Sequence, residues 1–543
     1  MSRTGIHCCF RLQHSGALYV GAELATTTRI TYKFEEEMQM KTKPMMAVLA
    51  GVLACVLAAS PAEAKKPPKM KMTTEVPAGV AIPDKVATRL GTLKFFDGFP
   101  DDATVEKLYD NLDFQRAVQA YLLGLAPVNQ LANRKGIAEL GPINTTVPIF
   151  EDRMDSKSLF LTPNNNTPYT WFWLDLRGGP LVLEVPPNVL GLMDDMWYSF
   201  VTDIGLVGPD KGKGGKYLIL PPGYTGEVPA GYFVVRPATF SVWVPWRSFL
   251  VDGDPKPGVD VVEKHTKIYL LKDAANPPPV KFVHVSGKDF STLAPADYPF
   301  WDYLNQVVQE EPTESIDPVT LGLYASIGIQ KGKPFAPDAR MKKILTEAAL
   351  VGDATARAIN SRFRIKESYY YPNSAWRSGF YGGYKFEQDG ARVLDAYSAF
   401  FFYATGVTPA MDSKTVGEGS QYMAAFVDAN GRPFDGGKNY KLHLPPNIPV
   451  KQFWSVILYD NQTRSMLQTD QKWPAVTSQN KTVLINPDGS VDVYFGPKAP
   501  AGKENNWVQT IPGKGWNTLL RLYGPLQPWF DKTWRPSEIE LIK

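Results

Sequence analysis

The chain has 543 residues, 44% of them hydrophobic and 21% charged, a composition typical of folded globular proteins and not of disordered chains. Its length predicts two or three domains. The net charge of +3, from 58 basic and 55 acidic side chains, is too small to favour nucleic-acid binding. The 46 prolines, 44 glycines and 12% aromatic residues predict sheets whose strands are joined by tight turns.

An export signal is predicted near the start of the sequence, over about residues 40–64. Lys41 and Lys43 supply a basic start, residues 45–59 are apolar, and residues 62–64 (Ala-Glu-Ala) provide the small residues of a cleavage site. The apolar segment is too short for a stable membrane span. We therefore expect a periplasmic or secreted protein with no membrane span after cleavage.

The residues before this signal, 1–39, are interpreted as an over-extended start, because a signal peptide should begin a protein. A lipoprotein anchored at Cys55 is the alternative. We rank it second, because the apolar segment continues past Cys55 and Leu53 fits a lipidation motif poorly. Cys8, Cys9 and Cys55 all precede the cleavage site, so the mature chain is expected to contain no disulfide, thiolate metal site or cysteine nucleophile.

The segment after the signal, residues 65–100, is predicted to be a basic, proline-containing tether. From 101 to about 140, apolar residues recur at spacings of three and four, which predicts a helix. From roughly 145 to 275, short aromatic and β-branched runs alternate with Gly and Pro turns. That pattern predicts a β-sandwich-like block.

A helical region is predicted next, most clearly over 338–363, with Asp338 as the N-cap. A further short helix is predicted over 392–404. From about residue 421 onward the pattern is one strand after another, with the Asn-Pro-Asp-Gly sequence at 486–489 predicting a hairpin turn. These strands predict a second sheet domain.

The stretch 162–187, TPNNNTPYTWFWLDLRGGPLVLEVPP, has two interpretations. Asn164–Asn166 before Pro168 suit a turn, because asparagine hydrogen-bonds to nearby backbone. The strand after it carries bulky residues on both faces, which favours a strand buried on both sides. The alternative is that the amides and Tyr169 line a pocket mouth, with Arg177 or another arginine opposite.

No motif in the sequence identifies a phosphate, metal or hydrolase site. The Gly/Lys-rich segment 208–224 leads into a strand and not into a helix, which favours a flexible basic hairpin loop over a phosphate loop. His265, His284 and His443 have no metal-like neighbours, and no HExxH or GxSxG motif is present, so we expect no metal site and no cofactor. The remaining acid–base candidates are Asp175, Asp203, Glu367, Asp395 and Asp460.

A second polar cluster is predicted in the later sheet domain. Tyr459 and Asp460 end one predicted strand, Arg464 follows it, and Arg521 and Tyr523 share one face of another. The simpler interpretation is a buried Arg–Asp pair that holds the sheets together. Tyr459 and Arg521 remain candidate ligand contacts.

In these motifs the chain resembles a family of exported, mainly bacterial proteins with paired domains of unknown function, numbered 1254 (N-terminal) and 1214 (C-terminal). The first resemblance rests on TPNNNTPYTWFWLDLRGGPLVLEVPP, GPDKGKGGKYLILPPGY and ATFSVWVPWRSFLVDG. The second rests on FFYATGVTPAM, FWSVILYD, NTLLRLYGPL and TWRPSEIELIK. Together these motifs span the chain from about residue 100 to its end.

The resemblance implies a mainly β fold with a helical insert: an N-terminal immunoglobulin-like β-sandwich and a C-terminal jelly-roll-like β-sandwich. The predicted segments are 1–64 for the over-extended start and signal peptide, 65–100 for the tether, 101–290 for the N-terminal domain, 291–410 for the helical region and 411–543 for the C-terminal domain.

The resemblance implies no established activity, and none of the family's recurring positions is an agreed catalytic residue. Many relatives carry an aspartate in the Asn-rich turn where this chain has Asn166, which favours a turn or binding role there. The recurring positions fall here on Asn165, Thr167, Tyr169, Asp175, Arg247, Trp454, Tyr459, Arg521 and Tyr523.

Two functions are compatible with the sequence. The first is an exported envelope protein that binds a polar small molecule or glycan or serves a structural role, and by analogy forms a homo-oligomer. The second is a hydrolase-type enzyme on glycans or similar substrates, which requires two carboxylates to converge at about 5–10 Å in one cleft. We favour the first, because no catalytic motif stands out, and assign no catalytic residue. The candidate ligand contacts are Asn165, Tyr169, Asp175, Arg247, Tyr459 and Arg521.

Overall fold

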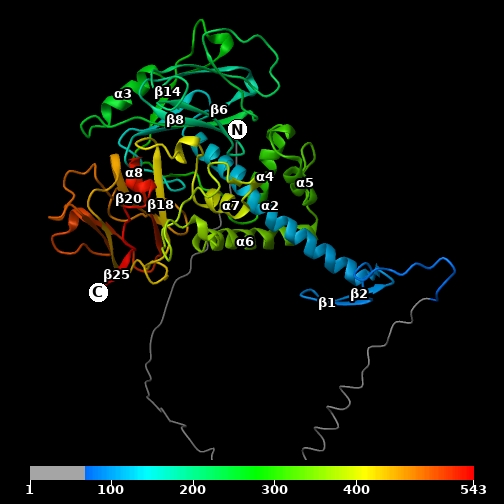
Figure 1. The fold of residues 1–543 in the computed structure, drawn as a ribbon. Coiled ribbons are helices and arrows are strands. Elements are labelled where there is room, and N and C mark those ends of the chain that lie inside the picture. The colour runs from blue at the N-terminus through cyan, green and yellow to red at the C-terminus, as the bar shows by residue number, and fades with distance from the viewer. Residues whose placement is uncertain (1–67) are drawn as a thin grey trace, which may run out of the picture. The chain divides into compact units, whose positions relative to one another are not determined.

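The computed structural model describes residues 68–543 (Figure 1). The predicted signal peptide and Cys55 lie outside the described residues. The chain divides into two units, Met1–Ile82 and Pro83–Lys543, and everything below concerns the second. Within the described residues, no helix has the length and apolarity that crossing a membrane requires.

A small antiparallel sheet and a long helix open the second unit. Strands β1 (Lys85–Thr88), β2 (Gly91–Phe96) and β3 (Phe99–Pro100) pair in sequence order, inside the segment predicted as a tether. Helix α2 (Asp102–Ala138) follows, close to the predicted limits. Its N-cap is Asp101, whose carboxylate accepts a hydrogen bond from the Thr104 backbone N–H at 2.8 Å.

Two sheets build the next part of the unit. A six-stranded sheet has the order β14-β4-β6-β12-β8-β9, and a four-stranded sheet has the order β11-β10-β7-β13. Phe172 of the first sheet and Leu183 of the second share one buried core. The strands are β4 (Thr146–Phe150), β6 (Tyr169–Asp175), β7 (Leu181–Val185), β8 (Leu190–Asp195), β9 (Phe200–Gly205), β10 (Gly215–Ile219), β11 (Phe233–Val235), β12 (Ser241–Arg247), β13 (Lys267–Leu270) and β14 (Lys281–His284). The short β5 (Ser158–Leu159) pairs with β15 (Phe290–Ser291), and helix α3 spans Lys256–His265.

Helices follow, as predicted, and α2 contacts each of the four main ones (Figure 1). Helices α6 and α7 match the predicted segments 338–363 and 392–404. The predicted N-cap of α6 is confirmed, because the Asp338 carboxylate accepts a hydrogen bond from the Met341 backbone N–H at 2.7 Å. The four helices are α4 (Pro299–Glu310), α5 (Pro318–Ser326), α6 (Ala339–Ser361) and α7 (Leu394–Tyr403).

Two four-stranded sheets form the C-terminal part, with the orders β18-β24-β20-β21 and β23-β22-β19-β25. Leu522 of the first and Leu442 of the second lie in a common buried core. The strands are β18 (Ser420–Ala425), β19 (Asn439–Leu444), β20 (Val450–Asp460), β21 (Ala475–Thr477), β22 (Val491–Gly496), β23 (Trp507–Gln509), β24 (Trp516–Pro525) and β25 (Glu540–Ile542). The two-residue strands β16 (Glu387–Gln388) and β17 (Ala391–Arg392) pair with each other, and helix α8 spans Gln527–Phe530.

Side-chain alternation along the strands explains how the N- and C-terminal sheets approach each other. On β6, Phe172 enters the core between the N-terminal sheets, whereas Trp171 points to a second cluster shared with the helices. On β24, Leu520 enters the C-terminal core, whereas Leu519 joins that same shared cluster. Strand β6 is therefore buried on both faces, as its bulky residues predict.

The mainly β fold with a helical insert agrees with the prediction. Three of the four larger sheets are mixed, because β4 pairs with β14, β10 with β11 and β22 with β23 in parallel, whereas the sheet β18-β24-β20-β21 is antiparallel. The immunoglobulin-like and jelly-roll-like assignments, and the domain limits, stay predictions.

Candidate functional site

A cavity of about 690 Å³ lies where the N-terminal sheets, the helical region and the C-terminal sheets meet. Residues of β6, β8 and β12 line it on one side, and residues of β18, β20 and β24 on another. The end of α7 and the segment 404–420 complete its wall. The cavity thus lies at the junction of the two sheet-containing parts of the chain.

The N-terminal wall is mostly aromatic. Tyr169 and Trp171 from β6, and Trp243 and Arg247 from β12, all line the cavity. Strands β6 and β12 are antiparallel neighbours in which Tyr169 lies opposite Arg247 and Trp173 opposite Trp243. The period of two along each strand brings these side chains to the same face of the sheet.

The C-terminal wall combines tyrosines with a second arginine. Tyr422 on β18 lies opposite Arg521 on β24, and both line the cavity. Tyr523, two residues further along β24, also lines it, and its ring stacks on Phe453 of β20 at 4.1 Å between centroids. That stacking fixes the orientation of Tyr523.

Arg521 ties the two walls together. Its Nη2 donates hydrogen bonds to the Thr162 carbonyl and to the Tyr459 hydroxyl, each at 2.7 Å. The Tyr459 hydroxyl in turn donates to the Pro163 carbonyl at 2.8 Å. Although Arg521 is only 6% exposed, its Nε has no hydrogen-bond partner among the described residues. The Nη2 atom of this guanidinium thus holds the two walls together, whereas the Nε–H is left without an acceptor.

Arg247 lies between two tyrosine rings of the same cavity. Its guanidinium carbon is 5.3 Å from the ring centroid of Tyr169 and 5.7 Å from that of Tyr523. Arg521 lies two residues before Tyr523 on the same face of β24, so it brings a second guanidinium to this part of the wall. None of the ion pairs formed within residues 68–543 includes Arg247 or Arg521. Two positive charges therefore lie close together without a carboxylate partner in the described structure.

The Asn-rich turn forms the edge of the cavity next to these arginines. The Asn164 side-chain oxygen accepts a hydrogen bond from the Asn166 backbone N–H at 2.8 Å, so the predicted turn contains an Asx turn. Asn164 and Thr167 line the cavity, whereas Asn165 and Asn166 are buried behind it. The buried atoms Asn164 Nδ2, Asn165 Oδ1, Asn166 Oδ1 and Thr167 Oγ1 have no hydrogen-bond partner within the described residues.

A third arginine, Arg377, lines another part of the wall. Its Nη2 donates to the backbone and side-chain oxygens of Asn360 at 2.8 and 2.7 Å, and its guanidinium packs on the rings of Phe363 and Phe426. Burial lowers the pKa of Arg377 to about 10, so it stays protonated at neutral pH.

The acidic side chains are arranged differently from a glycosidase pair. Of the five predicted acid–base candidates, Asp203 lines the cavity and the other four do not. Burial raises the pKa of Asp203 to about 6, opposed by a hydrogen bond from the Thr408 hydroxyl. Asp395 pairs with Arg364, and Asp460 pairs with Lys514. Nothing in the described residues supports the carboxylate-pair hydrolase.

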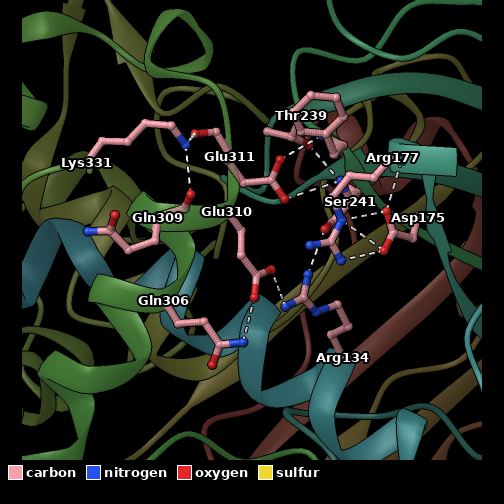
Figure 2. A network of polar contacts seen from close by, with 11 residues as sticks. Arg134, Asp175, Arg177, Thr239, Ser241, Gln306, Gln309, Glu310, Glu311 and Lys331 are labelled. Carbon is pink, nitrogen blue, oxygen red and sulfur yellow. Dashed lines mark hydrogen bonds and ion pairs between the residues drawn. The ribbon is translucent and has the colours of Figure 1, made fainter. Parts of the chain in front are cut away.

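Asp175 lies in a polar network away from the cavity (Figure 2). Its carboxylate accepts hydrogen bonds from Arg177 Nε at 2.9 and 3.1 Å. Burial would raise the pKa of Asp175, but the hydrogen bonds and charge of Arg177 outweigh it and lower that pKa. Nearby, Arg134 bonds to Ser241 at 2.7 Å and pairs with Glu310 at 2.5 Å, which links α2, β12 and α4.

The structure brings together three of the six predicted ligand contacts. Tyr169, Arg247 and Arg521 line the cavity, Tyr459 lies behind Arg521, Asn165 is buried in the turn, and Asp175 lies elsewhere. Sequence reasoning missed Tyr422 and Arg377, although the alternation in SQYMAA was the available signal for Tyr422. Within residues 68–543, no group of three His, Cys, Asp or Glu side chains is placed to hold a metal ion.

The Gly/Lys-rich segment does not bring its lysines to the cavity. The buried carboxylate of Asp210 holds this loop, since it accepts hydrogen bonds from the backbone N–H groups of Gly205 at 2.8 Å and Gly214 at 3.1 Å and from the Tyr217 hydroxyl at 2.5 Å. The loop is thus tied to its own strands.

Two family models match the chain, in the order that the sequence motifs indicated. Residues 144–270 match the family described as "Protein of unknown function (DUF1254)", and residues 419–527 match "Protein of unknown function (DUF1214)". A search of curated proteins found no match.

Two solved structures are similar to this chain. The VPA0106 protein from Vibrio parahaemolyticus is 20% identical with a TM-score of 0.50, over 79% of this chain and 100% of that one. An uncharacterized protein from Burkholderia cenocepacia is 12% identical with a TM-score of 0.36, over 80% of this chain and 96% of that one. The likeness to the first concerns the fold alone.

Proposed function

The chain carries a DUF1254 domain followed by a DUF1214 domain, and we propose that it is an exported protein that binds a polar small molecule in the cavity between them. The export part of the proposal rests on the signal-peptide pattern over residues 40–64. The binding part rests on the cavity.

The observation that carries the proposal is a set of buried polar atoms without hydrogen-bond partners on the cavity-lining residues. Such an atom costs about 1–3 kcal/mol when it stays unpaired, and folded proteins therefore keep few of them. Several around one cavity are what a site for a polar ligand needs. The atoms are Asn164 Nδ2, Thr167 Oγ1, Trp171 Nε1, Trp243 Nε1, Arg377 Nε, Arg521 Nε and Tyr523 OH.

The size and position of the cavity support the same proposal. Its volume of about 690 Å³ lies inside the range of about 300–1,000 Å³ that is usual for small-molecule sites. Since both family-matched segments contribute wall residues, a bound molecule would contact both domains. That contact gives a physical reason for the two domains to work as a pair.

A thermal-unfolding screen of the purified protein tests the proposal. The screen uses organic acids, amino acids, sugars and short oligosaccharides, each at a large excess. A ligand present at about 100 times its dissociation constant should add about 2.7 kcal/mol of stability. The side chains of Trp171 and Trp243 face the cavity, so the same ligand should change the intrinsic tryptophan fluorescence.

Two variants test whether the stabilisation and the fluorescence change arise from binding in the cavity. Ala404→Phe adds a ring at a position that lines the cavity, and should abolish both signals. Val234→Phe adds the same ring at an exposed position of β11 and should keep them. A ligand whose signals survive Ala404→Phe, or a screen without any hit, would contradict the proposal.

A further inference from the structure

We propose that the ligand of this cavity is an organic anion, with a carboxylate or phosphate head held between Arg247 and Arg521 and an apolar body against the aromatic walls. This inference rests on the proposed function and adds the chemical class of the ligand.

The charges of the cavity wall favour an anion. Three arginines, Arg247, Arg377 and Arg521, line the cavity against two acids, Asp203 and Glu418. An arginine side chain stays protonated at any physiological pH, so positive charge predominates. Neither Arg247 nor Arg521 takes part in an ion pair formed within residues 68–543. Burying a charge without a partner is unfavourable, and two like charges that lie close together add to the cost. An anion between them would offset both effects.

The hydrogen-bonding groups near the two arginines point to the same ligand class. Arg521 Nε is an unpartnered donor, and the Tyr523 hydroxyl, buried in the same wall, is also unpartnered. The Arg247 guanidinium, which lies over the Tyr523 ring at 5.7 Å, packs against aromatic rings. A guanidinium can only donate hydrogen bonds. Ionised carboxylates and phosphates are the groups that accept such bonds most strongly.

The rest of the wall is suited to an apolar body. Trp171, Trp243, Phe380, Phe400 and Leu519 line the cavity together with the arginines. A bare inorganic ion would leave most of the 690 Å³ unfilled. Burial of an apolar body against these rings would add a hydrophobic contribution to the charge contribution. The geometry therefore favours an amphipathic acid over a small inorganic anion.

Matched pairs of compounds separate charge from shape. We would titrate the protein by calorimetry with aliphatic and aromatic carboxylic acids, their primary amides, the corresponding alkyl phosphates, and inorganic phosphate. The expected result is that some acids or alkyl phosphates bind at least tenfold more tightly than the matched amide. Carboxylate and phosphate members of one series tell the two head groups apart.

Variants of Arg247 then assign the charge effect. Arg247→Gln should weaken the binding of the best acid at least tenfold, while the dissociation constant of the matched amide should change less than twofold. Arg247→Lys keeps the charge without the planar fork and should recover part of the affinity. The control is Arg364→Gln, at an exposed arginine that pairs with Asp395 outside the cavity. This variant should leave every dissociation constant unchanged. Circular dichroism of each variant checks that it is folded.

The outcomes distinguish this inference from the proposed function. Amides that bind as tightly as acids, or acid binding that Arg247→Gln does not affect, would overturn the anion inference and leave small-molecule binding in place. If inorganic phosphate binds as tightly as the organic anions, the inference that the ligand has an apolar body is overturned. If no compound of the charged or neutral series binds, both this inference and the proposed function are overturned.

Discussion

Arg521 on β24 donates a hydrogen bond to the Thr162 carbonyl at 2.7 Å, which joins the C-terminal sheet to the Asn-rich turn of the N-terminal part. The same Nη2 atom donates to Tyr459, whose hydroxyl reaches Pro163. One buried guanidinium therefore does two things: it fixes the junction of the two domains, and it brings a positive charge to the cavity.

Replacing this arginine should loosen the junction. Arg521→Gln removes two charge-assisted hydrogen bonds but also removes a desolvated charge, so we expect a net loss of about 1–3 kcal/mol of unfolding free energy. Urea denaturation measures it. Arg364→Gln, at an exposed ion pair, should give no measurable loss. An Arg521→Gln protein as stable as the wild type would mean that Arg521 does not hold the junction.

Ionisation of the buried Asp203 should make an unfavourable contribution to the stability of the protein as the pH rises. Burial raises the pKa of Asp203 from 3.8 to about 6. Since Asp203 then binds more protons in the folded than in the unfolded state between these values, its contribution to the free energy of unfolding decreases from about pH 4 to pH 6 and stays lower above it. Burial likewise raises the pKa of Asp195 to about 7, which extends the decrease.

Asp203→Asn isolates this contribution, because an amide keeps an acceptor for Thr408 without the charge. We expect it to raise the unfolding free energy at pH 8 by about 1–2 kcal/mol, allowing for solvent screening, and to change it little at pH 4. Urea titrations at the two pH values measure the difference. Glu347→Gln, at an exposed acid of α6, is the control. An equal effect of Asp203→Asn at both pH values would refute the assignment.

The segment after α7 that closes the cavity should depend on Asp194. This fully buried carboxylate accepts a hydrogen bond from the Val407 backbone N–H at 2.9 Å. We expect Asp194→Ala to increase hydrogen exchange over residues 405–412, whereas Asp194→Asn, which can still accept that bond, should not. Equal exchange in both variants would show that Asp194 does not hold the segment.

The mature protein should begin at Lys65. Mass spectrometry of the protein from an exporting host, expressed from the full gene, should give the mass of residues 65–543. A lipid-modified N-terminus at Cys55, lost in Cys55→Ser, would instead support the lipoprotein alternative. A protein retained at its full length would contradict export.

Local patterns predicted the helices and most strands, because spacing and turn residues are properties of a few neighbouring positions. The limits of α2, α6 and α7 lie close to the predicted ones. The hairpin at 486–489 was only half right. Gly489 N donates to the Asn486 carbonyl at 2.9 Å, but β22 pairs with β19 and β23 and not with the residues before the turn. The structure of the residues after the turn is therefore determined by pairing with strands that are distant in the sequence.

The site was less predictable, because it depends on which strands become neighbours. Arg247 and Arg521 were each singled out, but no local pattern tells that they meet in one cavity. Tyr422 faces this cavity because β18 pairs with β24. The contact of Asp175 with Arg177 is local, between residues two apart in the chain, whereas the position of Asp175 away from the cavity follows from the packing of the sheets.

The most direct measurement is a crystal structure of the protein grown with the tightest compound from the screen. Binding in the cavity predicts density for that compound there, with its polar groups within hydrogen-bond distance of Tyr523, Thr167 or the two arginines. Density for the compound at any other place on the chain, with the cavity unchanged, would contradict it.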